Sequence, residues 1–258
     1  MPQSSGKTRP SFCQTLDMLH GVAMNPASLS PTLSRLFPAG AVAAELRCPG
    51  DPALLLPEEA KYLSRTAVPK RVQEFAAGRL CARRALAEFG IVDFPIEVAG
   101  DRQPIWPNSM VGSITHTAGY CAAVVAERGC AGALGLDSEV VGDVKVEVWS
   151  SICSPAELIW VRSLAALQQA MAVTLIFSAK EAFYKCQYPL IRDRVGFHDV
   201  AVEAPAGYAA SGTFRIRAIG NISSAMRAVM PLQGRYLFQE GLVTAGIGWP
   251  PQASAQPQ

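Results

Sequence analysis

Two carboxylates one residue apart are the first candidates for chemistry in this chain. The segment LGLDSE, residues 134–139, places Asp137 and Glu139 on either side of Ser138. In a β-strand successive side chains alternate between the two faces, so both carboxylates would point the same way and the serine the other way. Neighbouring carboxylates repel, so this pattern indicates a cation between them or a bound proton. A solvated acidic turn at the end of a strand explains the segment equally well.

A second charged group lies in FSAKEAFYK, residues 177–185. On a helix, Glu181 and Lys185 stand one turn apart on one side, with Lys180 beside them. In most helices such a pair is exposed and contributes only a few tenths of a kcal/mol. The apolar stretch AVTLIF precedes this one, however, which favours the wall of a site over a solvated face.

Taken together, the two segments predict a metal site. Asp137, Glu139 and Glu181 would supply three hard oxygen ligands, which suit Mg²⁺, with Mn²⁺ as the alternative. The adjacent lysines, Lys180 and Lys185, would oppose the remaining charge of a phosphate. The predicted chemistry is therefore metal-assisted reaction at a pyrophosphate or phosphodiester.

Upstream residues offer partners for phosphate. Arg71 and Arg79 lie about two turns apart on a predicted helix over residues 69–90, and their guanidinium groups suit phosphate oxygens. Gly78, inside that helix, costs about 1 kcal/mol relative to alanine and suggests a close approach to its backbone. A basic solvent-facing stripe with a tolerated glycine is the alternative.

Two further segments could contact the same ligand. GDRQPIWP places Arg102 and Trp106 in a proline-stiffened loop, although such loops are common on surfaces. GSITHT places His116 just before a predicted strand, where it suits a phosphate hydrogen bond better than a metal, because the chain has only 3 histidines.

The composition limits the class of protein. Of the 258 residues, 50% are hydrophobic and 17% charged, and 23 basic residues nearly balance 21 acidic ones. These values argue against disorder, a coiled coil or a basic nucleic-acid platform. The 7 cysteines show no zinc or redox spacing and are interpreted as reduced thiols. Without an apolar signal segment or a membrane-length apolar run, we expect a cytoplasmic protein with no membrane span.

The predicted elements follow the order helix then strands, twice. Besides the helix over 69–90, we expect a helix from Pro57, one from the capping box that begins at Ser154, and a long one over 170–187. The first forty residues and residues 91–113 read as extended or loop-rich, and 251–258 as a disordered tail. The predicted strands cover residues 120–127, 132–139, 200–203, 213–218, 235–239 and 242–247.

The order of these motifs resembles the 4'-phosphopantetheinyl transferases of the Sfp and enterobactin synthase component D type. The resemblance covers residues 10–247 and rests on the segments already quoted, together with RVQEFAAGRLCARRAL and GLDSE in their order. It implies an α/β (α+β) fold of two similar halves with pseudo-twofold symmetry, each a small, mostly antiparallel sheet on a long helix. The boundaries would be residues 1–130 and 131–250, with coenzyme A between the halves.

The resemblance also implies roles for individual residues. The acids at 137, 139 and 181 would hold Mg²⁺ on the coenzyme A pyrophosphate, which Lys185 would contact. The phosphates and the adenosine end would meet a set from the first half: Arg71, Arg79, Arg102, Ser113, Thr115 and His116. Gly135 matches the family's G-x-D motif.

The expected reaction moves the 4'-phosphopantetheine arm to a serine of an apo acyl, peptidyl or aryl carrier protein and releases 3',5'-adenosine bisphosphate. Asp137, Glu181 and Lys185 are the expected catalytic residues, and Glu181 or a water on the metal could remove the serine proton. We expect a monomer that binds no nucleic acid.

A Mg²⁺-dependent nuclease is a rival function, although the near-neutral charge is poor for binding DNA. The other rival is a module that binds coenzyme A or a carrier protein without catalysis.

Overall fold

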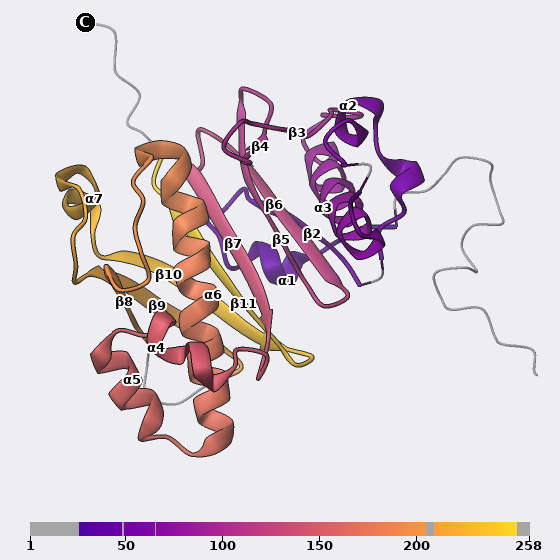
Figure 1. Cartoon of the computed structure of the whole chain (residues 1–258). Helices are drawn as coiled ribbons and strands as arrows, with labels where there is room; N and C mark the ends of the chain where they lie inside the picture. Colours follow the sequence, from indigo (N-terminus) through magenta and orange to yellow (C-terminus); the bar gives the residue numbers. More distant parts are fainter. Residues whose placement is uncertain (1–25, 48, 65, 205–208, 252–258) are drawn as a thin grey trace, which may run out of the picture.

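The described chain folds into two main antiparallel sheets, each crossed by one long helix, and a third sheet of only two strands. The computed structural model describes residues 26–47, 49–64, 66–204 and 209–251. Figure 1 shows helix α3 against the first sheet and helix α6 across the second. This mixed helical and antiparallel architecture confirms the predicted fold class. The start of the resemblance at residue 10, His20 and residues 252–258 of the predicted tail lie outside the described residues.

The first sheet has the strand order β1-β2-β6-β5. Helix α3 starts with a proline at its first position, as the sequence indicated, and it ends three residues before Gly90, whose φ of 71° suits glycine. The elements of this half are β1 (Ser28–Leu29), α1 (Pro31–Ser34), β2 (Val42–Leu46), η1 (Pro52–Leu54), α2 (Pro57–Ala60), α3 (Pro69–Ala87), β3 (Glu97–Val98), β4 (Pro104–Ile105), β5 (Met110–Thr117) and β6 (Tyr120–Glu127).

The second sheet has the order β7-β11-β10-β9-β8. The Ser154 capping box is present, with the serine side chain and Glu157 each accepting from a backbone N–H of the other residue. The elements are β7 (Ala133–Val140), η2 (Val146–Val148), α4 (Trp149–Ile152), α5 (Pro155–Arg162), α6 (Ala166–Ile191), β8 (Val200–Glu203), β9 (Ser211–Ala218), α7 (Ser224–Val229), β10 (Leu232–Gln239) and β11 (Leu242–Trp249).

Several elements differ from the sequence prediction. Strand β2 lies just after the first forty residues, where no element was predicted, strand β5 begins inside the segment expected to be loop-rich, and the short helix α7 was not predicted. Strand β2 is short and rich in alanine, which is a poor strand former. Strand β5 points polar Ser113 and Thr115 into the interior, so the usual alternation of apolar and polar residues is missing.

A shared hydrophobic core joins the two halves. It packs Leu33 and Phe37 of the first half with Leu134 and Leu136 of β7. At Gly246 of β11, an added Cβ would lie 2.8 Å from the Phe37 ring, so the glycine permits this close packing. The relative position of the halves is therefore set by a buried apolar contact.

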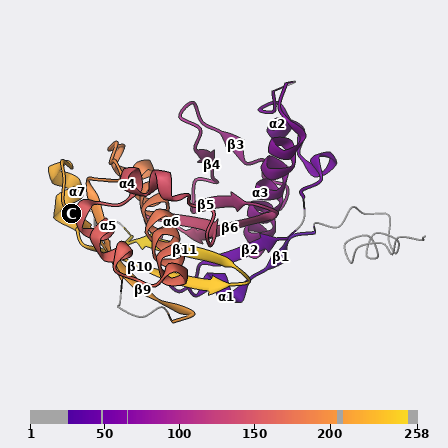
Figure 2. The same cartoon turned by 60° about the horizontal axis from the view of Figure 1, so that its bottom comes forward.

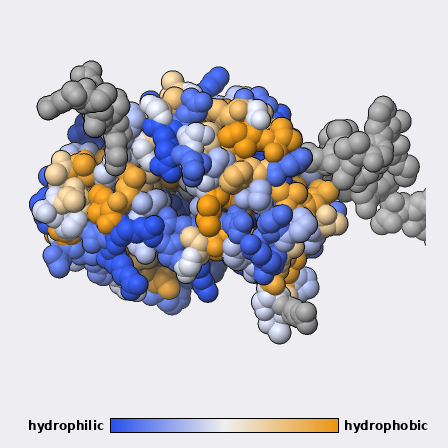
Figure 3. All heavy atoms as spheres, turned by 90° about the horizontal axis from the view of Figure 1, so that it is seen from above, coloured by the Kyte–Doolittle hydropathy of each residue, from blue (hydrophilic) through white to orange (hydrophobic). Residues whose placement is uncertain are grey.

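The β3–β4 hairpin stands out from this body. Figure 2 shows it projecting beyond the edge of the first sheet. Figure 3, a view from above, shows hydrophilic residues interspersed with several separate hydrophobic patches. Across the described residues, no helix combines the length and apolar character that a membrane crossing requires. The cysteines among the described residues form no disulfide, and all but Cys130 are buried.

Candidate functional site

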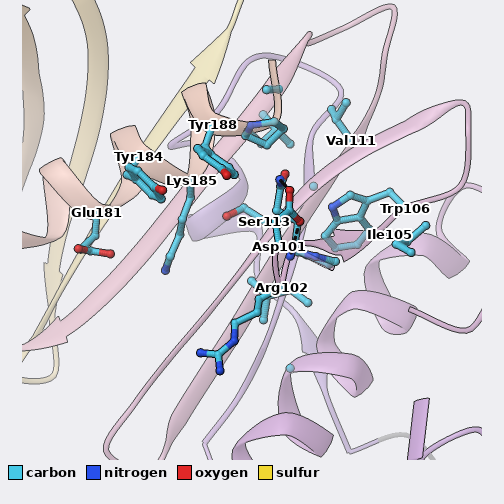
Figure 4. Close-up of a pocket in the computed structure, with 18 of the residues that line it drawn as sticks. Asp101, Arg102, Ile105, Trp106, Val111, Ser113, Glu181, Tyr184, Lys185 and Tyr188 are labelled. Carbon is cyan, nitrogen blue, oxygen red and sulfur yellow. Dashed lines mark hydrogen bonds between the residues drawn. The ribbon is translucent and has the colours of Figure 1, made fainter. Parts of the chain in front are cut away.

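A cleft of about 1110 Å³ lies between the halves. In Figure 4, Glu181, Tyr184, Lys185 and Tyr188 of α6 line one side, and Trp106 and Ile105 of the hairpin region lie opposite. The cleft is strongly cationic, because three acids, Glu74, Asp101 and Glu181, face a larger set of basic side chains. That set comprises Arg71, Arg79, Arg102, Arg128, Lys185, Arg192 and Arg194.

Asp137 is buried beside this cleft, at 4% exposure. Its Oδ1 accepts a hydrogen bond from Lys185 Nζ at 2.7 Å and a longer one from the Thr115 hydroxyl at 3.4 Å. Its Oδ2 is buried and has no hydrogen-bond partner. A buried carboxylate oxygen without a donor is costly, so this atom is suited to a cation that the polypeptide does not supply.

The other two acids share this electrostatic environment. Burial, followed by the charge of Asp137, raises the pKa of Glu139 to about 7, despite the opposing effect of Lys185. Burial and then Asp137 also raise the pKa of Glu181. The single ammonium group of Lys185 therefore does not balance the three carboxylates.

These three acids fit a divalent cation by their chemistry. Mg²⁺ and Mn²⁺ prefer oxygen ligands, and the unpartnered Oδ2 of Asp137 is such an oxygen. Within the part of the chain that the structure describes, however, no three His, Cys, Asp or Glu side chains are grouped as a ready-made metal site. Glu139 and Glu181 would have to move toward Asp137 to share one ion.

Gly135 places the acidic strand against α6. A Cβ at this position would lie 1.9 Å from the carbonyl oxygen of Ala182, so only glycine lets β7 approach the helix this closely. The Ser178 hydroxyl donates to the Asp137 carbonyl oxygen at 3.0 Å and fixes the same contact. The helix that carries Glu181 and Lys185 is thereby positioned relative to Asp137.

Ser138 lies on the other face of β7, as the strand geometry predicted. Its hydroxyl is fully buried and forms a 2.9 Å hydrogen bond with the Thr244 hydroxyl of β11. The serine side chain thus joins two strands on the face away from Asp137.

Ser113 and Thr115 were predicted near the phosphates, but the structure gives them another role. Their hydroxyls accept hydrogen bonds from the backbone N–H groups of Leu136 and Ser138, both at 3.0 Å. They therefore join the edge strands β5 and β7 of the two sheets. Ser113 still lines the cleft, whereas Thr115 is 1% exposed and its hydroxyl donates to the carboxylate of Asp137.

The structure places Lys180 away from the cleft, contrary to the predicted ligand contact. Its ammonium group donates to Glu157 Oε2 at 2.8 Å and to the carbonyl oxygens of Ile152 and Phe197 at 2.9 and 2.7 Å. Lys180 is five residues before Lys185, or about 140° around the helix, so the two side chains leave on different sides. Lys180 ties α6 to its supporting elements, and Lys185 alone faces the acids.

Arg71 and His116 meet at one end of the cleft. Arg71 Nη1 donates to His116 Nε2 at 3.0 Å, which requires a neutral ring with its proton on Nδ1. Burial, and then the charges of Arg71 and Lys185, lower the pKa of His116 in agreement. Glu74 Oε2 lies 3.7 Å from Nδ1 and 3.9 Å from Arg71 Nη1. This acid was missed in the sequence, although it follows Arg71 by one helical turn.

Arg79 also lines the cleft. Its guanidinium lies 3.8 Å from the centre of the Phe75 ring, and its Nε donates to the Ile96 carbonyl oxygen at 3.2 Å. Burial lowers its pKa to about 10, so the group remains cationic at neutral pH. The neighbouring Gly78 is approached by Ile114 of β5, whose methyl carbon would lie 2.8 Å from an added Cβ.

The β3–β4 hairpin brings Arg102 to the cleft from a tight turn. Arg102 has a φ of 72°, and its N–H donates to the Ala99 carbonyl oxygen at 2.8 Å. Beside it, Asp101 forms an ion pair with Arg192, which follows α6 in the other half. Trp106, after the hairpin, packs on Gly112, where an added Cβ would lie 2.7 Å from the indole ring.

Two cleft tyrosines were not predicted. Tyr184 and Tyr188 stack with ring centres 5.2 Å apart. They stand three and seven residues after Glu181, on the face that it shares with Lys185, so the helical spacing could have identified them.

Comparisons with known proteins cover both halves. Residues 58–126 match the 4'-phosphopantetheinyl transferase N-terminal domain, and residues 133–224 match the 4'-phosphopantetheinyl transferase superfamily. The chain is 37% identical over 221 residues to 4'-phosphopantetheinyl transferase Svp of Streptomyces mobaraensis, covering 83% of this chain and 88% of the relative. It is 36% identical over 200 residues to 4'-phosphopantetheinyl transferase PptT of Mycobacterium tuberculosis, covering 74% and 85%. With enterobactin synthase component D of Escherichia coli K12 it shares 35% identity over 135 residues, or 52% and 62%.

Proposed function

The chain belongs to the 4'-phosphopantetheinyl transferase superfamily, and we propose that its cleft moves the phosphopantetheine arm of coenzyme A to a carrier-protein serine with Mg²⁺ and releases 3',5'-adenosine bisphosphate. One observation carries this proposal. A large cationic cleft meets the buried Asp137 carboxylate at Lys185, and Oδ2 of that carboxylate has no hydrogen-bond partner.

The size and charge of the cleft suit coenzyme A. Small-molecule sites typically enclose ~300–1,000 Å³, and this cleft, at about 1110 Å³, is larger. Its arginines come from both halves, so an elongated ligand with phosphates at separate positions could contact several of them.

Asp137 through Oδ2, with Glu139 and Glu181, would hold the metal on the pyrophosphate side of the cleft. When bound there, Mg²⁺ supplies positive charge that stabilises the negative charge of the reacting pyrophosphate.

The residues of the chain would divide the remaining work. Lys185 would contact the pyrophosphate, and Arg71, Arg79 and Arg102 would bind the phosphates of the leaving nucleotide. As the serine oxygen bonds to the phosphorus that carries pantetheine, the bond from that phosphorus to the leaving bisphosphate breaks. Glu181 is our candidate for accepting the serine proton, because its carboxylate lines the cleft on the same helix as Lys185.

Mass spectrometry on a panel of apo acyl, peptidyl and aryl carrier proteins tests this function. With coenzyme A and Mg²⁺, we expect the mass of one phosphopantetheine arm on the acceptor serine and free 3',5'-adenosine bisphosphate. EDTA should abolish both products. Coenzyme A binding without transfer to any carrier would favour the non-catalytic module, and cleavage of a plasmid would favour the nuclease.

Three further predictions from the sequence belong to this proposal. We propose functional halves at residues 1–130 and 131–250, the first for the coenzyme A phosphates and the second for the metal acids. We also propose that the protein acts as a monomer and that it acts in the cytoplasm.

A further inference from the structure

We propose that Arg192, through its ion pair with Asp101, is a positioning residue that holds Arg102 over the coenzyme A cleft. This inference rests on the proposed function and adds a contact between the two halves that acts on substrate affinity. It concerns the hairpin formed by β3 and β4, whose turn carries both Asp101 and Arg102.

The hairpin is attached at two separate places. Near its base, Glu97 accepts from Lys61 Nζ at 2.8 Å and from the Tyr62 hydroxyl at 2.7 Å, all within the first half. At its turn, Asp101 pairs with Arg192 of the second half. Among the described residues, this is the one ion pair between the hairpin and the second half.

Further contacts hold each partner of this ion pair in place. Asp101 accepts from the side-chain amide of Gln103 at 2.7 Å and from its backbone N–H at 3.3 Å. Arg192 caps α6 with a φ of 61°, and its guanidinium lies 5.7 Å from the centre of the Tyr188 ring. A contact between two such groups can fix the turn without ordering long, free side chains.

The residue that gains from this contact is Arg102. It follows Asp101 directly, lines the cleft, and takes a left-handed backbone conformation that residues other than glycine rarely adopt. Release of Asp101 would leave the projecting turn held only by its base (Figure 2). Arg102 would then have to be ordered when the ligand binds, which lowers affinity.

Calorimetric titration with coenzyme A, without carrier protein, tests the role. We expect D101N and R192Q each to weaken binding roughly three- to tenfold, with the double variant no weaker than either single one. In an R102Q background, neither substitution should weaken binding further. In transfer assays the KM for coenzyme A should rise while kcat stays near the wild-type value.

The control is the exposed ion pair between Arg217 of β9 and Glu203 of β8. The Arg217 side chain is 61% exposed, as is the Arg192 side chain. R217Q should leave coenzyme A affinity unchanged. Equal affinities for R192Q and R217Q would overturn the inference, as would additive effects with R102Q. Tighter binding in D101N alone would show that Asp101 competes with the ligand for Arg192, which also overturns it. In all these outcomes, transfer by the wild-type protein would leave the proposed function standing.

Discussion

Lys185 Nζ lies 2.7 Å from Oδ1 of Asp137, while Oδ2 of the same carboxylate is buried without a hydrogen-bond partner. One oxygen is thus neutralised by the chain and the other is left for a cation. Asp137→Asn keeps the shape but removes the charge, so we expect transfer to fall at least about 100-fold. The thermal midpoint should stay close to that of the wild type.

Asp143→Asn is the matched control for that experiment. Asp143 lies in the exposed turn after β7 and contributes only a distant charge to Glu139. Wild-type carrier loading by D137N at saturating Mg²⁺ would contradict the role assigned to Asp137.

Gly135→Ala should separate β7 from α6. The new methyl group would meet the Ala182 carbonyl oxygen, and overpacking of this kind typically costs about 1–3 kcal/mol. Chemical denaturation should show the loss, and transfer should fall with it because Asp137 moves away from Glu181. Gly129→Ala, where an added Cβ meets nothing within 4 Å, should change neither quantity.

Thr115→Val tests the junction between the sheets. The substitution leaves the buried Ser138 N–H without its 3.0 Å acceptor, which costs about 1–3 kcal/mol. Thr117→Val, at the end of the same strand, should stay within about 0.5 kcal/mol of the wild type. Equal stability of the two variants in urea would argue against the role of the Thr115 hydroxyl.

Lys180→Met should affect the fold and leave ligand affinity unchanged. The substitution leaves buried Glu157 without its cationic partner, and breaking a buried ion pair costs about 3–5 kcal/mol of folding stability. In the fraction that remains folded at low temperature, the dissociation constant of coenzyme A should match the wild-type value. A larger dissociation constant in the folded variant would show that Lys180 contacts coenzyme A.

The raised pKa of Glu139 predicts how stability depends on pH without metal. The folded pKa of about 7 exceeds the reference value of 4.5, so the folded state holds an extra proton between them. Stability therefore falls as pH rises from about 4.5 to about 7, by about 1 kcal/mol after allowance for solvent screening. Glu139→Gln should remove this loss and melt roughly 2–4 °C above the wild type at pH 8 in EDTA. Parallel melting profiles of the two proteins would contradict the shift.

The sequence by itself determined the elements that local signals specify. The proline-initiated α3, the capping box at Ser154 and the strands that end in Glu127 and Glu203 follow from turn chemistry and periodicity over neighbouring residues. The alternation along β7 likewise determined that Asp137 and Ser138 face opposite ways. These features depend on contacts within a few residues of the chain.

Only the tertiary structure decided which distant partners the polar side chains of the site contact. Lys180 and Lys185 look alike in the sequence, but their directions on the helix commit one to Glu157 and the other to Asp137. From the sequence, the Thr115 hydroxyl could contact either a ligand or another strand. The packing of β5 against β7 decides for the strand, because it places this hydroxyl at the Ser138 N–H. The Asp101–Arg192 pair joins residues 91 positions apart. Such partners are brought together by the packing of whole elements, because a side chain's own sequence neighbours do not determine which distant residues it will face.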